Sequence, residues 1–185
     1  IAGAFSARAA IALALPPLET IRRANDKSCA LAAARKVGVP IPTTFAPESE
    51  EELREVIDRL RLPAVVKLRD DEGTTLEPAA RYAVAKTAGE VERAWRHLHG
   101  IRPFPLVQEK VEGEGWGVSV LMGAGGAVLA MLTHRRLREF PTTGGPSTLR
   151  ESARDAALEE AAVRLLRHIG WTGVAMVEFK KRPDG

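Results

Sequence analysis

Cysteine is almost absent from this chain of 185 residues, and its scarcity excludes two kinds of protein. Cys29 is the only cysteine, so the chain can form neither an intrachain disulfide nor a metal site built from several thiolates. Its place in an Ala-rich helical pattern favours a buried structural thiol over a nucleophile. This usage fits a reducing compartment, and we expect a cytoplasmic protein.

Long apolar runs and a strong charge excess are also lacking. The apolar stretch at residues 1–15 is interrupted by Arg8 and is too short to span a bilayer, so we expect no membrane partner. The formal net charge is only +3, which is too small and too dispersed to indicate nucleic-acid binding. The apolar content of 45% instead predicts a globular protein with one domain or two small lobes that share a cleft.

The familiar nucleotide-binding motifs are missing as well. Residues 113–117 (GEGWG) resemble a dinucleotide fingerprint, but the third glycine is misplaced and a strand follows where that motif needs a helix. No Walker A sequence occurs, and Ser147 lacks the nucleophile elbow that acyl transfer with His134 would need. A nucleotide site in this chain therefore needs another design.

What the sequence does contain is an alternation of helical and strand patterns. Capping residues, amphipathic spacing and terminal glycines predict helices over 18–24, 26–37, 49–60, 87–98 and 152–169. Short apolar runs predict strands over 64–68, 82–86, 106–108, 118–122, 127–133 and 172–180, with a glycine turn at 123–126 joining two of them as a hairpin. The pattern predicts an α+β fold in which helices pack on a face of a sheet.

Two lysines stand where a lone cation is unfavourable. Lys67 ends an apolar strand, so its ammonium group must emerge at the strand end or find a partner. Lys27 opens a predicted helix, where a cation opposes the helix dipole unless an anion is also present. Each residue alone is compatible with a solvated surface lysine, and the two together suggest a phosphate site.

Further charged residues follow the predicted strands of the second half. Arg135, Arg136 and Arg138 leave their strand on both of its faces, either as a solvated basic run or as a clamp on phosphate or carboxylate. Glu178 closes an apolar strand, where a carboxylate is unfavourable unless it meets a cation or a metal. The alternatives for Glu178 are a metal ligand and a salt bridge to Lys180 or to an arginine.

Six segments occur in a characteristic order. They are Asp26-Lys27, residues 38–42 (GVPIP), Val65-Val66-Lys67, residues 108–113 (QEKVEG), His134-Arg135-Arg136 and Val177-Glu178-Phe179. This order and spacing resemble the ATP-grasp superfamily of carboxylate–amine ligases, in particular its carbamoyl-phosphate synthase large-subunit-like and biotin-carboxylase-like members. The match covers about residues 16–182, and its specificity comes from the ordered set because no single motif is specific.

The resemblance implies an ATP-grasp fold of two α+β lobes with the nucleotide cleft between them. Residues 25–109 would form the first lobe and residues 110–185 the second, incomplete at its C-terminus, after a remnant of a preceding domain or linker at 1–24. A first residue other than Met and a turn signal at the end fit this expectation of a truncated fragment. Many members of the superfamily are dimers, so a homodimer is one expected assembly.

The resemblance also implies roles for individual residues. Lys27 and Lys67 look like the lysines that hold the α- and β-phosphates of ATP, and residues 109–111 look like the hinge that reads the adenine edge through backbone groups. The implied nucleotide-binding residues are Lys27, Lys67, Gln108, Glu109, Lys110, Val111 and His134. The implied catalytic residues are Arg135 and Arg136, and Glu178 looks like the first ligand of Mg²⁺, or alternatively of Mn²⁺.

The implied chemistry is phosphorylation of a small carboxylate by ATP, followed by attack of an amine, a thiol or a similar nucleophile on the acyl phosphate. Such chemistry needs cations along the triphosphate and a metal ion, with little covalent participation by the protein. The partners implied are therefore ATP, a small carboxylate and a nucleophile.

Three positions depart from the pattern of the superfamily. Residues 69–75 (RDDEGTT) have one glycine and three acids where several glycines usually cover the phosphates, and Gly117 stands where a polar ribose contact is expected. The second metal carboxylate would lie beyond Gly185, so we expect this fragment to be inactive even if its parent is a ligase. The alternatives are a nucleotide-binding module without ligase activity and a basic nucleic-acid-binding domain, whose affinity would fall steeply with salt.

Overall fold

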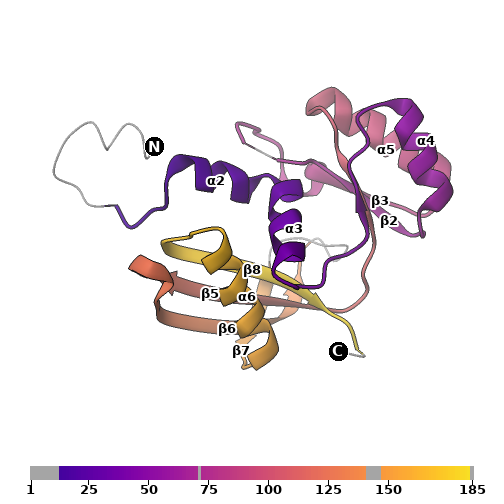
Figure 1. Cartoon of the computed structure of the whole chain (residues 1–185). Coiled ribbons are helices and arrows are strands. Elements are labelled where there is room, and N and C mark those ends of the chain that lie inside the picture. The colour runs from indigo at the N-terminus through magenta and orange to yellow at the C-terminus, as the bar shows by residue number, and fades with distance from the viewer. Residues whose placement is uncertain (1–12, 71, 141–146, 184–185) are drawn as a thin grey trace.

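The computed structural model describes residues 13–70, 72–140 and 147–183, which form two antiparallel four-stranded sheets with helices on them (Figure 1). The helices are α2 (Leu18–Asn25), α3 (Lys27–Lys36), α4 (Glu50–Arg59), α5 (Ala88–Ile101) and α6 (Ala156–His168). The strands are β1 (Thr44–Phe45), β2 (Ala64–Lys67), β3 (Tyr82–Ala85), β4 (Leu106–Glu109), β5 (Glu114–Met122), β6 (Val128–Glu139), β7 (Ser147–Ser152) and β8 (Gly173–Lys181). The predicted α+β class, with helices on one face of each sheet, is confirmed.

The first lobe is built on sheet A, whose strand order is β1-β4-β2-β3. Helices α4 and α5 cover one face, where Val66 of β2 packs with Leu53 and Trp95 in a buried cluster. Side chains alternate along a strand, so Val65 and Lys67 of β2 point to the opposite face. This second face, called here the open face of sheet A, carries Lys67 and Gln108.

The second lobe repeats the plan on sheet B, whose strand order is β7-β6-β5-β8. Helix α6 covers one face, where Val118 and Val120 of β5 pack with Ala162 of α6 and are at most 1% exposed. The alternating residues of β5, among them Gly115 and Gly117, lie on the opposite face, which we call the open face of sheet B. Each sheet therefore has one apolar face and one face free for polar groups.

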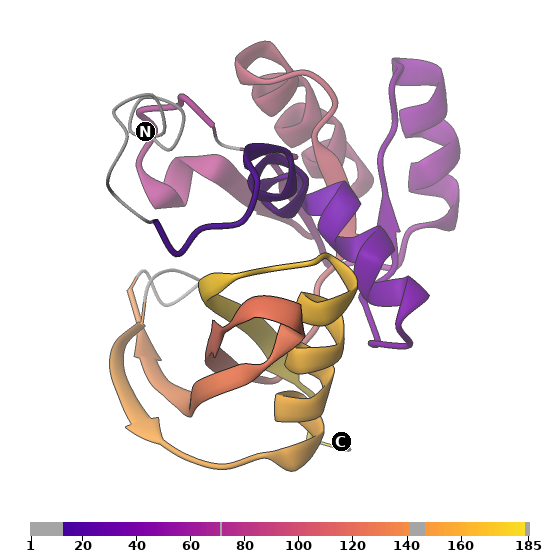
Figure 2. The same ribbon diagram turned by 60° about the vertical axis from the view of Figure 1, so that its left-hand side comes forward.

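Helix α3 makes contacts with both lobes. Its Ala34 packs in a small apolar cluster with Ala161 of α6, while the N–H of Lys27 donates a hydrogen bond to the carbonyl oxygen of Arg69, just after β2, at 2.9 Å. The two lobes lie one above the other in Figure 2, with α3 at their junction. The helix that opens the expected first lobe is therefore shared between the lobes.

Three predicted boundaries were wrong. Strand β5 begins at Glu114, four residues before its predicted start, so Gly115 and Gly117 lie inside the strand. Strand β6 continues to Glu139, well past the predicted end at Thr133, and so carries the whole arginine run inside the sheet. Ser152 does not cap a helix, because it is the last residue of β7, and the carboxylate of Asp155 caps α6 instead by accepting bonds from the N–H groups of Ala157 and Leu158. The sequence of β7 (STLRES) has no apolar alternation that would have revealed a strand.

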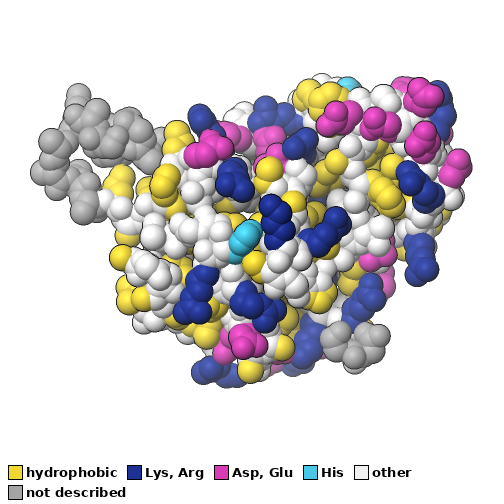
Figure 3. All heavy atoms as spheres, in the orientation of Figure 1, with side chains coloured by type: hydrophobic (Ala, Val, Ile, Leu, Met, Phe, Trp, Pro, Cys, Tyr) yellow, Lys and Arg dark blue, Asp and Glu magenta, His cyan; other side chains and the backbone are white. Residues whose placement is uncertain are grey.

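The surface shows an uneven distribution of charge. In Figure 3, Asp and Glu side chains gather over α4 and α5, whereas Lys and Arg spread across the rest of that face. No helix within the described residues combines the length and the apolarity needed to cross a membrane.

Candidate functional site

Lys67 lies at the end of β2 on the open face of sheet A and is held by neutral partners. Its Nζ donates a hydrogen bond to Oε1 of Gln108 at 2.8 Å, and Nε2 of Gln108 donates in turn to the Oγ1 of Thr44 at 2.6 Å. Gln108 is 8% exposed, so this chain of bonds is mostly shielded from water. Among the described residues, no carboxylate forms an ion pair with Lys67. The ammonium group is thus positioned without being neutralised.

The surroundings of Lys67 oppose its positive charge. Burial lowers the pKa of Lys67 from 10.5 to about 8, and the nearby Lys27 acts in the same direction. Two cations close together with no paired acid create a positive potential. An anion between Lys27 and Lys67 would offset the cost of holding a charged ammonium group away from water and would reduce the repulsion between the two lysines. The pair therefore has the electrostatics of a phosphate site.

Asp26, the carboxylate next to Lys27 in the sequence, is already bound to other groups. Its Oδ1 accepts hydrogen bonds from the N–H groups of Ser28 and Cys29 at 2.8 and 3.1 Å, and its Oδ2 pairs with Nε of Arg69 at 2.8 Å. Burial alone would raise the pKa of Asp26, but the bonds from Ser28, Cys29 and Arg69 outweigh it and lower that pKa. Asp26 is therefore committed to capping α3 and to Arg69, which leaves Lys27 available.

The described acidic residues of the loop after Lys67 bind to the end of α5 and not to Lys27 or Lys67. The carboxylate of Asp70 forms an ion pair with Arg102 at the end of α5, and Nη2 of Arg102 also donates to the carbonyl oxygen of Glu72 at 2.8 Å. Asp71 lies outside the described residues. Because Arg102 neutralises Asp70, the acidic residues that follow Lys67 in the sequence repel an anion bound at Lys67 less strongly.

The hinge between the lobes uses most of its backbone donors internally. The N–H of Glu109 donates to the carbonyl oxygen of Thr43 at 2.9 Å, and that of Lys110 donates to Pro63 at 3.0 Å. Within the described part of the chain, the N–H of Val111 has no such partner. Of the three hinge residues predicted to read adenine, Val111 is the one whose N–H remains available to a ligand.

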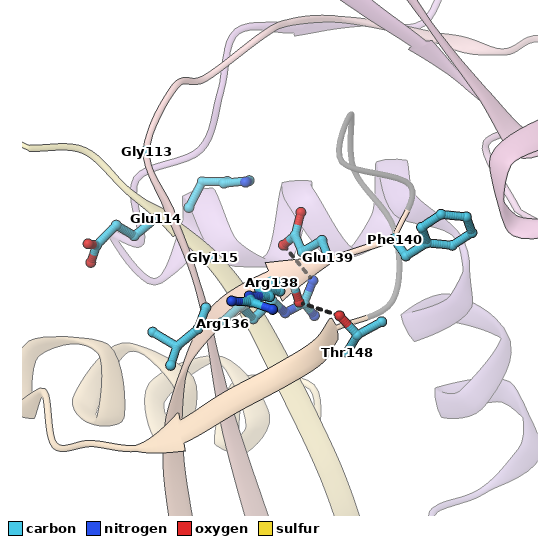
Figure 4. A pocket seen from close by; sticks show the side chains of 10 residues that line it. Gly113, Glu114, Gly115, Arg136, Arg138, Glu139, Phe140 and Thr148 are labelled. Carbon is cyan, nitrogen blue, oxygen red and sulfur yellow. Dashed lines mark hydrogen bonds and ion pairs between the residues drawn. The ribbon is translucent and has the colours of Figure 1, made fainter.

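On the open face of sheet B, three predicted residues meet around Gly117. Gly117 pairs with His134 on β6 and with Glu178 on β8, so these residues stand in one row across the sheet. Glu178 forms an ion pair with Arg136, which also reaches Oε1 of Glu139 through Nη1 at 3.5 Å (Figure 4). The salt bridge to an arginine, one of the two alternatives for Glu178, is thus a contact of the structure.

The imidazole of His134 lies directly on Gly117. A Cβ atom added to Gly117 would stand 2.4 Å from Cε1 of His134, far inside contact distance, which explains why this position is glycine. His134 is 4% exposed, and its Nε2 is buried without a partner in the described part of the chain. The space where a ribose contact was expected from residue 117 is therefore occupied by the ring of His134.

Arg135 and Arg136 do not act together. Arg135 points to the face covered by α6, where its Nε donates to Glu151 at 2.8 Å and its Nη1 reaches Glu114 at 3.3 Å. Arg136 points to the open face, because successive side chains of a strand alternate. The two arginines thus lie on opposite faces, as the alternation along the strand predicted, and only Arg136 shares a face with His134 and Glu178.

A cavity of about 600 Å³ adjoins this row at the hinge end of sheet B. Figure 4 shows Arg136 and Glu139 pointing toward one another beside it, with Gly115 on the neighbouring strand. Lys180 of β8 and Thr148 of β7 complete the wall. The volume falls in the range of small-molecule sites, so the open face of sheet B has room for a ligand.

The acidic residues do not form a metal cage. In the described ranges, no group of three or more His, Cys, Asp or Glu side chains is arranged to hold a metal ion. Glu178 is a single carboxylate on the open face. One carboxylate fits Mg²⁺, which usually keeps several waters and takes its other ligands from substrate phosphates, better than it fits a metal enclosed by protein.

Two residues of these networks escaped the sequence interpretation. Thr44, which orders Gln108, belongs to a strand of two residues that is too short to show a period. Arg150 stands on β7 directly opposite Arg136, and its strand was not predicted. The only available signal was the presence of several arginines on either side of one glycine-rich segment.

Comparison with known proteins gives similar solved structures, while no family model matches the sequence. A biotin carboxylase–β,γ-ATP complex from Campylobacter jejuni superimposes with a TM-score of 0.78 at 17% identity, covering 98% of this chain and 42% of that one. A D-alanine–D-alanine ligase from Bacillus anthracis complexed with ATP gives 0.74 at 16% identity, covering 98% and 59%. An N5-carboxyaminoimidazole ribonucleotide synthetase from Thermus thermophilus gives 0.70 at 22% identity, covering 91% and 45%. The chain thus spans about half the length of these similar structures.

Proposed function

Because the chain has the ATP-grasp fold, we propose that it is the nucleotide-binding core of an ATP-dependent carboxylate–amine ligase. The similar structures are ligases, a synthetase and a carboxylase, two of them in complexes with ATP or an analogue. Residues 25–109 and 110–185 would be its two lobes, with the nucleotide between them and α3 in contact with both.

The observation that carries the proposal is the pair of lysines on the first lobe. Lys67 is half-buried, its one hydrogen bond to a described residue goes to a neutral amide, and it lies close enough to Lys27 for that residue to contribute to the fall of its pKa to about 8. The negative charge of a triphosphate would stabilise the protonated form of both ammonium groups. The described residues around Lys67 supply no such charge. Gln108 then acts as a positioning residue for Lys67, and the free N–H of Val111 offers one donor to the adenine edge.

The proposed reaction has two steps. An oxygen of a small carboxylate attacks the γ-phosphorus of ATP, the bond from that phosphorus to the β–γ bridging oxygen breaks, and ADP leaves. The nitrogen of an amine then attacks the acyl carbon, the bond from that carbon to the phosphate oxygen breaks, and inorganic phosphate leaves as the nitrogen loses a proton. A thiol can replace the amine as the nucleophile of the second step, and bicarbonate can replace the carboxylate in the first step, where its oxygen attacks the γ-phosphorus in the same way.

The side chains of sheet B suit the charge that develops in the first step. Arg136 and His134 share a face with Glu178, which would hold Mg²⁺ or Mn²⁺. The metal supplies charge neutralisation on the phosphate oxygens when it is bound. Because Glu178 is one carboxylate and a two-metal site needs more acidic ligands, we propose that this chain alone binds nucleotide without catalysing ligation.

A second candidate is a nucleotide-binding module without ligase activity. The ion pair between Asp70 and Arg102 favours this candidate, because it holds the loop after Lys67 to α5. The loop also has few glycines, so its backbone has little freedom to cover phosphates. The two candidates share the nucleotide site and differ in turnover.

Calorimetry with Mg-ATP tests the shared part. We expect saturable binding by the chain and an affinity about 100-fold lower for Lys67→Met, because a charge-assisted contact with phosphate is lost. The exposed Lys36→Met variant is the matched control and should bind like the unmodified chain. Absence of binding at millimolar Mg-ATP, or equal loss in both variants, would contradict the proposal.

Isotope transfer separates ligase from binding module. Carboxylates labelled with ¹⁸O are incubated with ATP, amine and either this chain or a longer protein that contains it. A ligase moves one labelled oxygen into inorganic phosphate, and a binding module releases no carboxylate-dependent phosphate. Label in phosphate from this chain alone would overturn the expected inactivity of the fragment.

A further inference from the structure

Part of the outer edge of β6 is not covered by another described strand. Strand β7 pairs with β6 only from His134 onward, so residues 128–132 have β5 on one side and no described strand on the other. The N–H of Ala153 donates to the carbonyl oxygen of Thr133 at 3.0 Å, so the backbone groups of Thr133 point outward. Backbone groups alternate in direction along a strand, and those of Met131 therefore also point outward, on the side that β7 does not reach.

The side chains of residues 128–132 (VLAML) are apolar and exposed. The exposed fractions of Leu129 and Leu132 are 65% and 56%, and the segment contains neither a charged residue nor a proline. Soluble proteins usually protect such an edge with a charge, a proline or a covering element, because its free N–H and C=O groups can bind another strand. An apolar edge without this protection indicates a surface that pairs with a further strand.

The two outermost strands of sheet B are better protected. Strand β7 has an arginine and a glutamate among its six residues, and residues 178–181 of β8 (EFKK) include three charges. At the start of β8, a Cβ atom added to Gly173 would stand 1.9 Å from the carbonyl oxygen of Ala14, so the chain itself covers this part of the strand. Within the described ranges, residues 128–132 are thus the apolar stretch of edge in sheet B with neither form of protection.

Helix α6 lies beside this segment and has opposite charges near its two ends. Glu159 in its first turn accepts a bond from the hydroxyl of Thr133 at 2.8 Å, and Nε of Arg167 in its last turn donates to the carbonyl oxygen of Gly126 at 3.0 Å. The helix therefore runs antiparallel to β6, from one end of the free segment to the other. Glu160 is exposed and pairs only with an arginine one turn later, at 3.8 Å, while Arg167 forms no ion pair with an acid of the described residues.

From this arrangement we propose that residues 128–132 pair with the same residues of a second copy of the chain, antiparallel about a two-fold axis. The resemblance to the superfamily implied a homodimer without locating its interface, and this edge supplies one. The axis joins the two copies of sheet B into one continuous sheet and sets the two α6 helices in opposite directions on the same face of it. Glu160 of each copy then faces Arg167 of the other. This charge complementarity favours a second copy over an unrelated strand.

Cysteine cross-linking tests the position of the axis. Cys29 is first replaced by serine, which leaves no other thiol in the chain. Ala130→Cys, at the middle of the segment, should then form a covalent dimer on mild oxidation, because directly opposite Cα atoms of antiparallel strands lie about 4.5–5.5 Å apart, within the range of a disulfide. The matched control is Leu149→Cys on the outer strand β7, which is also exposed and should form little covalent dimer.

Sedimentation velocity measures the assembly in solution. The unmodified chain has a mass of 20.0 kDa and should sediment with about twice that mass at micromolar concentration. Met131→Lys should raise the dissociation constant of the dimer at least about tenfold, because like charges then meet across the axis. Val174→Lys, at the exposed start of β8, is the matched control and should leave the constant unchanged.

An exchange of charges on α6 separates loss of the interface from damage to the fold. Arg167→Glu should weaken the dimer about fivefold, because each Glu160 then faces a like charge. Adding Glu160→Arg to the same chain should restore the dimer. A variant that had merely lost its fold would not be restored in this way.

The remaining outcomes overturn the proposal. They are a monomer at about 100 μM, a dimer that Met131→Lys leaves intact, and an Ala130→Cys chain that does not cross-link. A dimer that only Val174→Lys disrupts assigns the interface to β8, and a longer protein that contains this chain but stays monomeric assigns the edge to the rest of that protein. Mg-ATP binding is measured on the same samples, so a failure of the dimer and a failure of the proposed function are seen separately.

Discussion

The cations on the open faces of the two sheets differ in whether an acid of the chain neutralises them. On sheet A, Lys67 has a neutral amide partner and a second lysine nearby, so its charge is unfavourable in the free protein. On sheet B, Arg136 is already paired with Glu178 and Glu139. A lysine can lose its proton and an arginine cannot, so the half-buried position without a paired acid suits a lysine better than an arginine. Sheet A is therefore prepared for an anion, whereas an anion on sheet B must compete with acids of the chain.

Gly117→Ala should break the open face of sheet B and produce the largest change in stability. The added Cβ would stand 2.4 Å from Cε1 of His134, so the ring must leave the sheet. We expect a loss of about 1–3 kcal/mol in the free energy of unfolding, measured with urea, as for other overpacked buried sites. Ser119→Ala, on the same face of the same strand, is the control. An unchanged free energy would mean that His134 does not rest on Gly117.

Gln108→Glu should make sheet A resemble sheet B. A carboxylate at this position would pair with Lys67, raise its pKa and stabilise the ligand-free chain. The affinity for Mg-ATP should fall about tenfold, because the phosphates then compete with an internal acid. Calorimetry measures the affinity and thermal unfolding measures the stability, with Gln108→Leu as the variant that removes the partner without adding charge. Tighter nucleotide binding by Gln108→Glu would contradict the comparison.

Asp26→Asn tests whether the charge at the start of α3 matters beyond its capping bonds. Asparagine also caps helices, so the variant loses chiefly the ion pair with Arg69, and we expect a loss of about 0.5–1 kcal/mol at neutral pH. The pKa of Asp26 is lowered in the folded chain, so its contribution is present above the unfolded pKa and lost as pH falls through the folded pKa. The difference between Asp26→Asn and the unmodified chain should accordingly vanish in acid. Urea unfolding at several pH values measures it, and a difference that persists in acid would show that the charge is not responsible.

The pH dependence of nucleotide binding is the smallest expected effect. With the pKa of Lys67 at about 8, half of the chains carry a neutral Lys67 at that pH, so the affinity for Mg-ATP should be about twofold lower at pH 8 than at pH 6.5. Binding at pH 8 should take up about half a proton, which calorimetry in buffers of different ionisation enthalpy detects.

The same pKa also makes a prediction about stability. The folded pKa lies below the unfolded value, so the penalty for a charged Lys67 is present below pH 8 and is relieved as the pH rises toward 10.5. Lys67→Arg should abolish both the proton uptake and this rise in stability, because arginine does not titrate there. An uptake that persists in this variant would assign the proton to another group.

The elements with a strong local signal were predictable from the sequence. The capping residues Ser49 and Thr87 began α4 and α5 as expected, because each side chain accepts a bond from the N–H three residues later. Short apolar runs likewise revealed β2, β4 and β8, because buried strands leave a compact apolar signal. The two-lobe fold followed from the order of six segments, and no single one of them would have been sufficient.

The rest depended on pairing between distant strands. The alternation along the strand already placed Arg135 and Arg136 on opposite faces, but only the register of β6 with β5 and β7 shows which residues lie opposite each of them. The bond between Lys67 and Gln108 joins residues far apart in the chain, and the position of His134 on Gly117 depends on the same kind of pairing. Short polar strands such as β1 and β7 have no periodicity to reveal them, so Thr44 and Arg150 could not be connected to the site.

The contact between Ala34 and Ala161 has a consequence for how the chain is made. Helix α3 leaves the ribosome long before α6 is synthesised, so Ala34 can pack with Val39 but not with Ala161 while the first lobe is being completed. Contacts between residues so distant in the chain close late and slow the folding of a domain. The contact between α3 and α6 is therefore among the last to form, after the strands of the first lobe have been made.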